Sequence, residues 1–404
     1  MITSFLDTDF YKLTMMQTVF HHYAGAWAEY KFKWRNWDRM SDSLKTHHAL
    51  ESFMEELNTS IRKLCNLRFA KDELAYLDSI HFFKPDFIEY LRLFQLNEDY
   101  IARVDVVEGI PNIIVEGPWL NTILFEVPIL AIVSELYTKH TGLVNYNIRK
   151  HGMENLKSKL TWLKRNVHRD APFQFADFGT RRRASYEWHE EVIEYLLENA
   201  RSYLAGTSNV LFAMNYEVKP IGTMAHEFIQ AHQQLGPRLV DSQAKALQTW
   251  ADEYRGELGI ALSDCLGFDM FLKDFDRYFA LLFDGCRHDS GDPTTWAEKL
   301  INHYRKLRID PRTKTAVFSD GLTFEIAVEL FKEFHTQINT AFGIGTYLTN
   351  DCGFEAPQIV MKMTKMNHKP VAKISDSPGK GMCEDEGFLT YLKQVVKEKV
   401  EGKW

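Results

Sequence analysis

The chain has 404 residues, with 48 Lys and Arg against 55 Asp and Glu and a formal net charge of −7. Its length fits two or three domains, and a composition that is 45% hydrophobic and 25% charged is typical of a soluble globular enzyme. The acidic average charge argues against a protein that coats nucleic acid or an anionic membrane, because such binding needs an extended basic face. The average charge does not exclude a local basic pocket that binds a small anion.

The most apolar stretch, residues 119–137, is interrupted by Asn121, Glu126, Pro128 and Glu135. A bilayer span needs about 20 predominantly apolar residues, so this stretch is predicted to be buried core. The N-terminus lacks the basic and apolar regions of a secretion signal. The five cysteines are widely spaced and form no C-x-x-C pair, which is typical of reduced thiols. These features predict a cytoplasmic protein.

In the first part of the chain, hydrophobic residues recur at helical spacing and predict helices over 43–65 and 86–97. Strand-like runs follow over 100–107 and 113–116. We therefore expect an added α/β domain over residues 1–140.

From about residue 172, short apolar runs alternate with helical patterns, which predicts parallel β-α units. Six such units favour an irregular TIM-like α/β barrel over two packed sheets. The predicted strands are 173–178, 218–221, 260–262, 281–283, 315–318 and 338–342. We expect the barrel domain to span 141–350. The C-terminal segment, 351–404, is expected to complete the barrel and to pack on the N-terminal domain.

The residues that follow each barrel strand are the most informative, because α/β barrels build their active sites at the C-terminal ends of the strands. Gly222-Thr223 ends one run, and Thr223 is expected to be the N-cap of the next helix. His226 then lies in the first helical turn, where unpaired amides and the helix dipole favour an anion. The alternative is a partly exposed helical histidine without a special role.

Three consecutive arginines, Arg181, Arg182 and Arg183, follow the run that ends at Phe178. Guanidinium groups bind two oxygens of a carboxylate or phosphate at once. Such a run is either a solvated surface or an anion site. We expect these arginines to converge with Arg287 at one end of the barrel.

Arg287 opens a loop that also carries two carboxylates, Asp289 and Asp292. Carboxylates in such a loop can bind sugar hydroxyls or hold Mg²⁺ through water. The alternative for Asp292 is that it only caps a helix starting at Pro293.

The run Gly343-Ile344-Gly345-Thr346 closes another strand with exposed amides and a hydroxyl, which predicts a phosphate cradle. It fails as a dinucleotide signature, because Leu348 replaces the third glycine. No Walker A loop is present, because Gly379-Lys380 is followed by Gly381. Taken together, the strand ends fit a sugar-phosphate substrate better than a peptide or a lipid.

Six motifs lie in order along nearly the whole chain: LDTDFYKLTM (6–15), DFGTRR (177–182), GTMAHE (222–227), DSGDP (289–293), GIGT (343–346) and KISDSPGK (373–380). Together they resemble the motifs of bacterial nicotinate phosphoribosyltransferases.

The resemblance implies transfer of phosphoribosyl from 5-phosphoribosyl 1-diphosphate to nicotinate, giving nicotinate mononucleotide and diphosphate in NAD salvage. It implies an irregular α/β barrel, ATP hydrolysis coupled through a phosphorylated histidine, and a homodimer with shared active sites. His226 matches the phosphorylated histidine. Mg²⁺ is the expected metal, with its ligands unassigned.

By the same resemblance, nicotinate would stack between Phe178 and Tyr11, with Tyr11 supplied by the partner subunit. The other matching positions are Thr223 and Arg287 for nicotinate, Thr346, Gly343 and Gly345 for the phosphoribosyl group, Arg181 and Arg182 for an anionic group of substrate, and Asp289 and Asp292 for ribose or Mg²⁺.

Ser208 bears on the choice between acid and amide. Related nicotinamide-specific enzymes carry an Asp after a Gly-Thr pair, whereas Gly206-Thr207 is followed here by Ser208, whose hydroxyl can donate to a carboxylate. Nicotinate is therefore the expected ligand. The alternatives are a nicotinamide or quinolinate phosphoribosyltransferase, a non-catalytic metabolite-binding regulator, and an aldolase-like barrel that uses Lys373 as a Schiff-base lysine.

Overall fold

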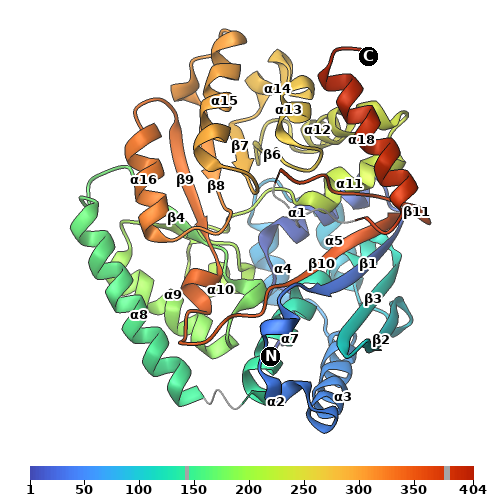
Figure 1. Ribbon diagram of the computed structural model, residues 1–404, viewed down its shortest axis with the longest axis vertical. Coiled ribbons are helices and arrows are strands. Elements are labelled where there is room, and N and C mark those ends of the chain that lie inside the picture. The colour runs from blue at the N-terminus through green and yellow to red at the C-terminus, as the bar shows by residue number, and fades with distance from the viewer. Residues whose placement is uncertain (142–144, 377–382) are drawn as a thin grey trace.

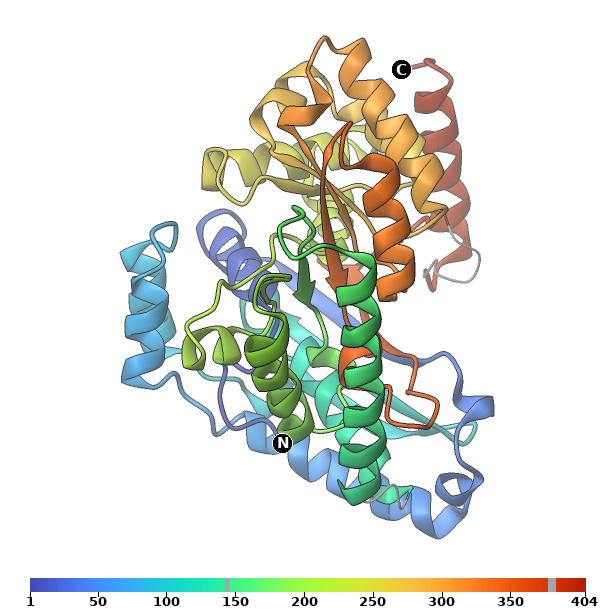
Figure 2. The same ribbon diagram turned by 90° about the vertical axis from the view of Figure 1, so that its left-hand side faces the viewer.

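The computed structural model describes residues 1–141, 145–376 and 383–404. Ser377 to Lys380 of the last motif lie outside these described residues. Two sheets organise the chain, an antiparallel one of five strands and a parallel one of six. Figure 1 shows the parallel strands in the upper half and the antiparallel strands below them to the right. Figure 2 shows the same two layers from the side.

The antiparallel sheet has the order β11-β10-β1-β3-β2. Its strands are β1 (Trp27–Trp34), β2 (Ile101–Val107), β3 (Ile110–Pro118), β10 (Ile359–Met366) and β11 (Lys369–Pro370). The predicted strands over 100–107 and 113–116 are confirmed as β2 and β3. Strands β1 and β10 were not predicted, and they pair with each other from Ala28–Met366 to Trp34–Ile359.

The parallel sheet has the order β5-β4-β9-β8-β7-β6. Its strands are β4 (Phe175–Asp177), β5 (Leu204–Thr207), β6 (Ile260–Leu262), β7 (Gly285–His288), β8 (Thr315–Phe318) and β9 (Asn339–Ile344). The segment 218–223 spans the gap between the two edge strands. The Ile221 amide donates to the Thr207 carbonyl over 2.8 Å, and the Thr223 hydroxyl donates to the Ile260 carbonyl over 2.8 Å. The predicted irregular barrel is confirmed.

Two of the predicted barrel strands are wrong. Residues 218–221 make only an isolated bridge, Thr207 to Pro220, and Leu204–Thr207 forms the regular strand instead. Residues 281–283 belong to the end of α14 (Arg277–Leu282), which Asp276 caps by accepting from the Phe279 amide. The strand begins only at Gly285, where a Cβ would lie 1.9 Å from the Thr315 carbonyl oxygen.

Helices cover both sheets. They are α1 (Phe10–His22), α2 (Asp42–Lys45), α3 (His47–Leu64), α4 (Lys71–Asp78), α5 (Pro85–Leu93), α6 (Trp119–Thr122), α7 (Glu126–His140), α8 (Asn145–Asn166), α9 (Tyr186–Ala200), α10 (Val210–Asn215), α11 (His226–Leu235), α12 (Ser242–Tyr254), α13 (Phe268–Asp274), α15 (Pro293–Lys306), α16 (Phe324–Phe334), α17 (Thr346–Thr349) and α18 (Glu386–Val400). The helix predicted over 43–65 is split into α2 and α3, and that over 86–97 ends at Leu93.

The C-terminal segment joins both parts of the molecule. Its strand β10 lies between β11 and β1 in the antiparallel sheet, whereas α18 packs against α13 of the barrel through a small apolar cluster that includes Leu392 and Met270. Figure 1 shows α18 beside the barrel helices and far from α3.

The apolar stretch that begins at Trp119 is confirmed as core. Among the described residues, Trp119–His140 is long and apolar enough to cross a membrane, yet 89% of its most apolar window is buried inside the protein. The two carboxylates that interrupt it are ion-paired, because Glu126 contacts Lys12 and Glu135 contacts Arg183. Burial of such charges is tolerated only when each has a partner.

The sequence predicted that Arg183 would join the other arginines at the barrel end, and this prediction is wrong. Its side chain is fully buried and donates to both oxygens of Asp7 (2.6 and 2.7 Å) and to Glu135 (2.9 Å). Burial alone would raise the pKa of Asp7, but the guanidinium of Arg183 holds it below its ordinary value. The ion pair therefore ties the N-terminal segment and α7 to the barrel.

Replacing Arg183 with Met leaves the buried carboxylate of Asp7 without its guanidinium and leaves Glu135 with only the N-terminal ammonium. Breaking a buried pair in this way costs about 3–5 kcal/mol, so we expect R183M to lose that much free energy of unfolding in a urea titration. The control is R169M, which removes an arginine that is 81% exposed and should change stability by less than about 0.5 kcal/mol. A loss below about 1 kcal/mol for R183M would contradict this assignment.

Candidate active site

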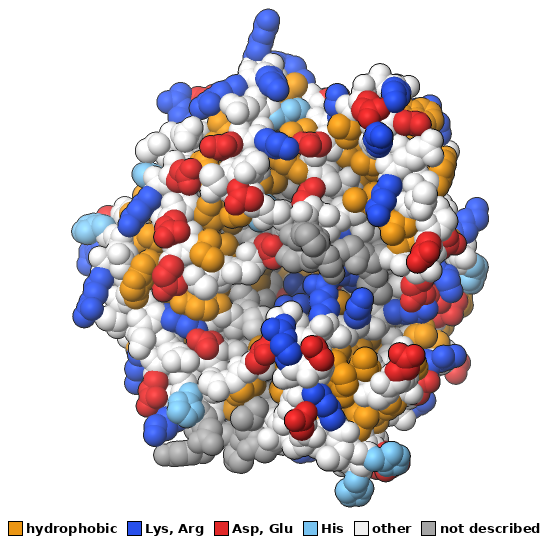
Figure 3. Space-filling view, in the orientation of Figure 1, with side chains coloured by type: hydrophobic (Ala, Val, Ile, Leu, Met, Phe, Trp, Pro, Cys, Tyr) orange, Lys and Arg blue, Asp and Glu red, His pale blue; other side chains and the backbone are white. Residues whose placement is uncertain are grey.

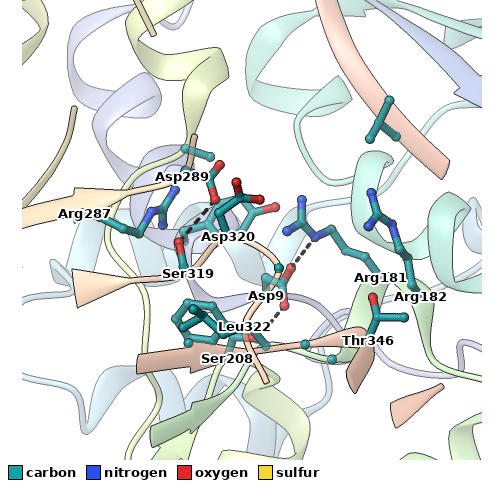
Figure 4. Close-up of a pocket in the computed structure, with 18 of the residues that line it drawn as sticks. Asp9, Arg181, Arg182, Ser208, Arg287, Asp289, Ser319, Asp320, Leu322 and Thr346 are labelled. Atoms are coloured by element: carbon teal, nitrogen blue, oxygen red, sulfur yellow. Dashed lines mark hydrogen bonds and ion pairs between the residues drawn. The ribbon is translucent and has the colours of Figure 1, made fainter. Parts of the chain in front are cut away.

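A cavity of about 490 Å³ opens at the C-terminal ends of the parallel strands. Its walls come from the barrel loops, from the start of α1 and from the antiparallel strands β1 and β10. Figure 3 shows a hollow near the centre of one face of the molecule, with Lys and Arg side chains at its rim. The close-up in Figure 4 shows Arg287, Asp289 and Asp320 on one side of the cavity and Arg181 and Arg182 on the other.

Most of the site residues predicted from the sequence line this cavity. They are Tyr11, Phe178, Arg181, Arg182, His226, Arg287, Asp289, Gly343, Gly345 and Thr346. Thr223 and Asp292 are not among the lining residues. Thr223 does not cap the helix that follows, because α11 starts at His226 with Ala225 as N-cap, and the Thr223 hydroxyl instead fastens the barrel at Ile260.

Asp292 is a helix cap, which is the alternative role that the sequence allowed. Its carboxylate accepts from the Thr295 amide over 2.8 Å and caps α15, which begins at Pro293. This bond, together with that helix end, keeps the pKa of Asp292 below its ordinary value. Asp292 thus holds the loop that carries Asp289 and does not line the cavity.

Tyr11 and Phe178 both line the cavity from one and the same chain. The resemblance implied that Tyr11 would come from a partner subunit, whereas here Tyr11 of the same chain lines the cavity. Tyr11 opens α1 and is 7% exposed, and a Cβ at Gly222 would lie 3.0 Å from its backbone nitrogen. The barrel loop therefore passes directly against this end of α1.

The two glycines of the 343–346 motif give Phe178 its position. A Cβ at Gly343 would lie 2.3 Å from Cε2 of the Phe178 ring, and one at Gly345 would lie 2.8 Å from the Phe178 carbonyl oxygen. Both distances are shorter than a real Cβ contact. These glycines therefore make room for an aromatic wall, which the sequence interpretation as a phosphate cradle did not foresee.

His226 is held by a buried carboxylate that lies beyond the residues selected from the sequence. Its Nε2 lies 2.8 Å from Oδ1 of Asp264 and 3.6 Å from Oδ2 of Asp289. Lys373 lies 2.7 Å from the same Nε2 and 2.7 Å from Oδ2 of Asp264. The His226 side chain is 18% exposed, and the cluster faces the cavity through His226, Asp289 and Lys373, whereas Asp264 lies behind them.

The cluster keeps its histidine neutral and its carboxylates charged. Burial, assisted by Lys373, lowers the pKa of His226. Burial alone would raise the pKa of Asp264, but His226 and Lys373 hold it well below its ordinary value. A neutral imidazole beside a charged carboxylate is the arrangement of a nucleophile or a general base.

Four cations line the cavity and form a basic wall that begins beside the His226 cluster: Arg35, Arg182, Lys362 and Lys373. Burial, with Lys373 and Arg35 nearby, lowers the pKa of Lys362 to about 7, and burial with Arg181 and Arg35 lowers that of Arg182 to about 10. Cations that depress one another's pKa are stabilised when an anion enters. This wall is therefore suited to a phosphate or diphosphate group.

Arg35 and Lys362 lie outside the sequence prediction because they belong to the antiparallel sheet. Arg35 follows β1, and Lys362 lies within β10. A search for site residues at the ends of the barrel strands therefore cannot find Arg35 or Lys362. Asp264, in contrast, lies two residues after the correctly predicted strand 260–262. The same inspection of strand ends could therefore have selected it.

Ser208 has a different partner from the one expected. Its hydroxyl donates to Oδ1 of Asp9 over 2.6 Å, while Oδ2 of Asp9 lies 3.4 Å from Nε of Arg181. Figure 4 shows both contacts. Because the hydroxyl proton is used within the protein, Ser208 alone does not explain a preference for an acid.

Arg287 provides a more direct reason for such a preference. It lies in β7, lines the cavity, and its buried Nε has no hydrogen-bond partner among the described residues. A buried guanidinium N–H without an acceptor is costly. A bound carboxylate would supply the missing acceptor.

Comparison with known proteins decides the family. The family model described as "Nicotinate phosphoribosyltransferase (NAPRTase) family" matches residues 173–399, and the model of the corresponding N-terminal domain matches residues 6–134. The chain belongs to the nicotinate phosphoribosyltransferase family.

Close relatives carry the same name along their whole length. A nicotinate phosphoribosyltransferase of Acidovorax sp. (strain JS42) is 52% identical over 402 residues, covering 98% of each chain. One from Burkholderia mallei is 50% identical over 396 residues, covering 98% of this chain and 96% of the relative.

Solved structures of the family share the fold. The nicotinate phosphoribosyltransferase from Vibrio cholerae superimposes with a TM-score of 0.91 at 36% identity, covering 100% of this chain and 96% of the other. That from Porphyromonas gingivalis gives 0.89 at 33% identity, covering 98% and 100%.

The contact between Gly343 and the Phe178 ring predicts a binding defect without a folding defect. G343A should push the ring out of place and raise the KM for nicotinate by up to about tenfold, the loss expected for one aromatic stacking contact. Steady-state kinetics measure this effect. The control is G25A, since a Cβ at Gly25 meets nothing within 4 Å. An unchanged KM in G343A would show that the ring position does not matter.

Proposed function

We propose that this chain transfers phosphoribosyl from 5-phosphoribosyl 1-diphosphate to nicotinate, releasing nicotinate mononucleotide and diphosphate, with ATP as a co-substrate. Family membership supports the transfer reaction. The observation in the structure that carries it is the combination, in one cavity, of two aromatic rings, an Arg287 nitrogen without an acceptor, and a wall of cations.

The pyridine ring would lie between Tyr11 and Phe178, with its carboxylate on Arg287. Its nitrogen attacks the glycosidic carbon, where positive charge develops as diphosphate leaves. No general base is needed, because the pyridine nitrogen carries no proton to remove. The protein orients the ring and stabilises the leaving diphosphate with the cationic wall.

His226 is the proposed acceptor of the ATP γ-phosphoryl group. Asp264 engages Nε2, and Nδ1 makes no hydrogen bond to another described residue. In the proposed step, the Nδ1 lone pair attacks the γ-phosphorus, the bond to the bridging oxygen breaks, and ADP leaves with that electron pair. Asp264 stabilises the positive charge that the imidazole acquires. His226 lies in the first turn of α11, where the helix dipole favours the added anion.

Asp289 and Asp320 are the residues that fit Mg²⁺. Both are carboxylates on the cavity wall, and Mg²⁺ is usually bound by one or two carboxylates together with substrate phosphates. The metal would neutralise charge on the leaving diphosphate. The group formed by His226, Asp264 and Asp289 fits less well, because it includes a nitrogen ligand and an ammonium that already occupies Asp264.

Arg287 supports the acid over the amide, because a carboxylate pairs with a guanidinium more strongly than a neutral amide does. Nicotinamide and quinolinate remain the alternatives within this fold, and competition against nicotinate at equal concentration separates them. The Schiff-base interpretation of Lys373 is disfavoured, because its side chain is 3% exposed and ion-paired with Asp264, whereas a Schiff-base lysine must present an uncharged amine to a carbonyl carbon. A non-catalytic regulator would not need the acidic and basic walls together.

The wider setting follows from the same features. Four buried cysteines and one partly buried cysteine are all free thiols, which supports a reducing compartment such as the cytoplasm. The homodimer implied by the resemblance stays a prediction, and residues from a second subunit are not required to furnish Tyr11.

Replacing His226 tests the coupling to ATP. We expect the wild-type protein to form an acid-labile phosphohistidine on incubation with ATP and Mg²⁺, and H226A to form none and to lose ATP-stimulated turnover while keeping slow ATP-independent transfer. Radiolabelled ATP and diphosphate release measure the two quantities. The matched control is H168A, an exposed histidine with 78% side-chain exposure. ATP-stimulated turnover in H226A would exclude the coupling role.

A further inference from the structure

Three side chains meet at one imidazole nitrogen in the cavity wall. Nζ of Lys373 lies 2.7 Å from Nε2 of His226, and Oδ1 of Asp264 lies 2.8 Å from the same atom. Lys373 also contacts Oδ2 of Asp264 at 2.7 Å. The Lys373 side chain is 3% exposed and that of Asp264 is 1% exposed, so water does not separate these groups.

The two neighbours make incompatible demands on Nε2. A lysine ammonium can only donate a hydrogen bond, and an ionised carboxylate can only accept one. Nε2 must lack a proton to accept from Lys373 and must carry one to donate to Asp264. A neutral imidazole therefore satisfies one partner at a time, and each partner selects the opposite tautomer.

The choice of tautomer decides whether His226 can react. When Lys373 holds Nε2, the ring proton lies on Nδ1 and removes the lone pair that would attack phosphorus. When Asp264 holds Nε2, the proton lies on Nε2 and Nδ1 keeps its lone pair. An ammonium 2.7 Å from Nε2 disfavours a second positive charge on the ring, so the imidazole is neutral and the two states compete.

Lys373 is the partner that can yield. Asp264 is fixed at the end of β6, where its Oδ2 also accepts from the Ser290 hydroxyl over 2.6 Å. Lys373 has a flexible four-carbon chain and lines the cavity beside Lys362 and Arg35. An anion that enters among these cations attracts the ammonium of Lys373 toward itself and away from Nε2.

We propose that Lys373 is a positioning residue that keeps His226 in its unreactive tautomer until a phosphate-bearing substrate draws the ammonium from Nε2 to itself. The inference rests on the proposed function of His226 as phosphoryl acceptor. The tautomer exchange is balanced through water: Nε2 takes up one proton, Nδ1 releases one, and the charge of the ring is unchanged. ATP is thereby spent only when the cavity holds an anion.

Nitrogen-15 NMR of the imidazole rings tests the proposal in the resting protein, with the His226 signals assigned by their loss in H226A. We expect the Nδ1–H tautomer in the wild type and the Nε2–H tautomer in K373M, where Asp264 is the remaining partner. K373R should keep the wild-type tautomer, because its guanidinium still donates. The Nε2–H tautomer in the resting wild type, or the Nδ1–H tautomer in K373M, would overturn the proposal.

A second measurement uses only the wild-type protein and so does not depend on a variant that folds. Adding inorganic diphosphate without ATP should convert His226 from the Nδ1–H to the Nε2–H tautomer in step with binding. Diphosphate that binds without changing the tautomer would overturn the proposal. Failure of the proposed function is seen separately, as absence of phosphohistidine from the wild type after incubation with ATP.

Discussion

The buried guanidinium of Arg183 holds the N-terminal segment against the barrel, and the geometry of the cavity depends on it. Arg183 follows the strand that carries Phe178, whereas its partner Asp7 lies four residues before Tyr11. The Phe10 amide continues the contact by donating to the Ser208 carbonyl over 2.7 Å. This attachment brings Asp9 and Tyr11 into the cavity opposite the barrel residues. One ion pair thus links two segments that lie far apart in the sequence.

The net charge of the chain does not describe the cavity, where cations and carboxylates gather on separate parts of the wall. A net charge of −7 excludes an extended basic face but allows a local one, and Arg35, Arg182 and Lys362 form it beside the carboxylates of Asp289 and Asp320. Burial first, and the neighbouring cations second, lower the pKa of Lys362 and of Arg182, so these cations also repel one another. Part of the binding energy for a phosphate therefore comes from relieving this repulsion.

The sequence predicted the barrel and most of its site because both obey local rules. Apolar runs such as 315–318 form strands, and the polar residues that follow them meet at one edge. The prediction failed where a contact between distant segments decides the outcome. Gly285 starts a strand because it pairs with Thr315 of β8, at an approach so close that only glycine fits. Strand β10 joins the antiparallel sheet through pairing with β1, more than 300 residues away.

Individual roles were harder to predict than positions. Arg183 looks like its neighbours Arg181 and Arg182 in the sequence, yet it is fully buried and ion-paired, because only its side chain reaches Asp7 and Glu135. Thr223 binds a backbone carbonyl of the neighbouring strand instead of capping the helix. Such differences depend on the direction of single side chains, which residue type and spacing do not specify.

Tyr11 and Phe178 of the same chain line one cavity, which predicts that a single chain supplies both aromatic walls of its site. Coexpression of Y11A with F178A, each expected to be inactive alone, tests this claim most directly. Both lesions then remain in separate chains, and we predict that the mixed preparation stays as inactive as either variant. If sites were shared between subunits, random pairing in a two-fold dimer would restore about a quarter of them, and recovery of activity near that level would contradict the account.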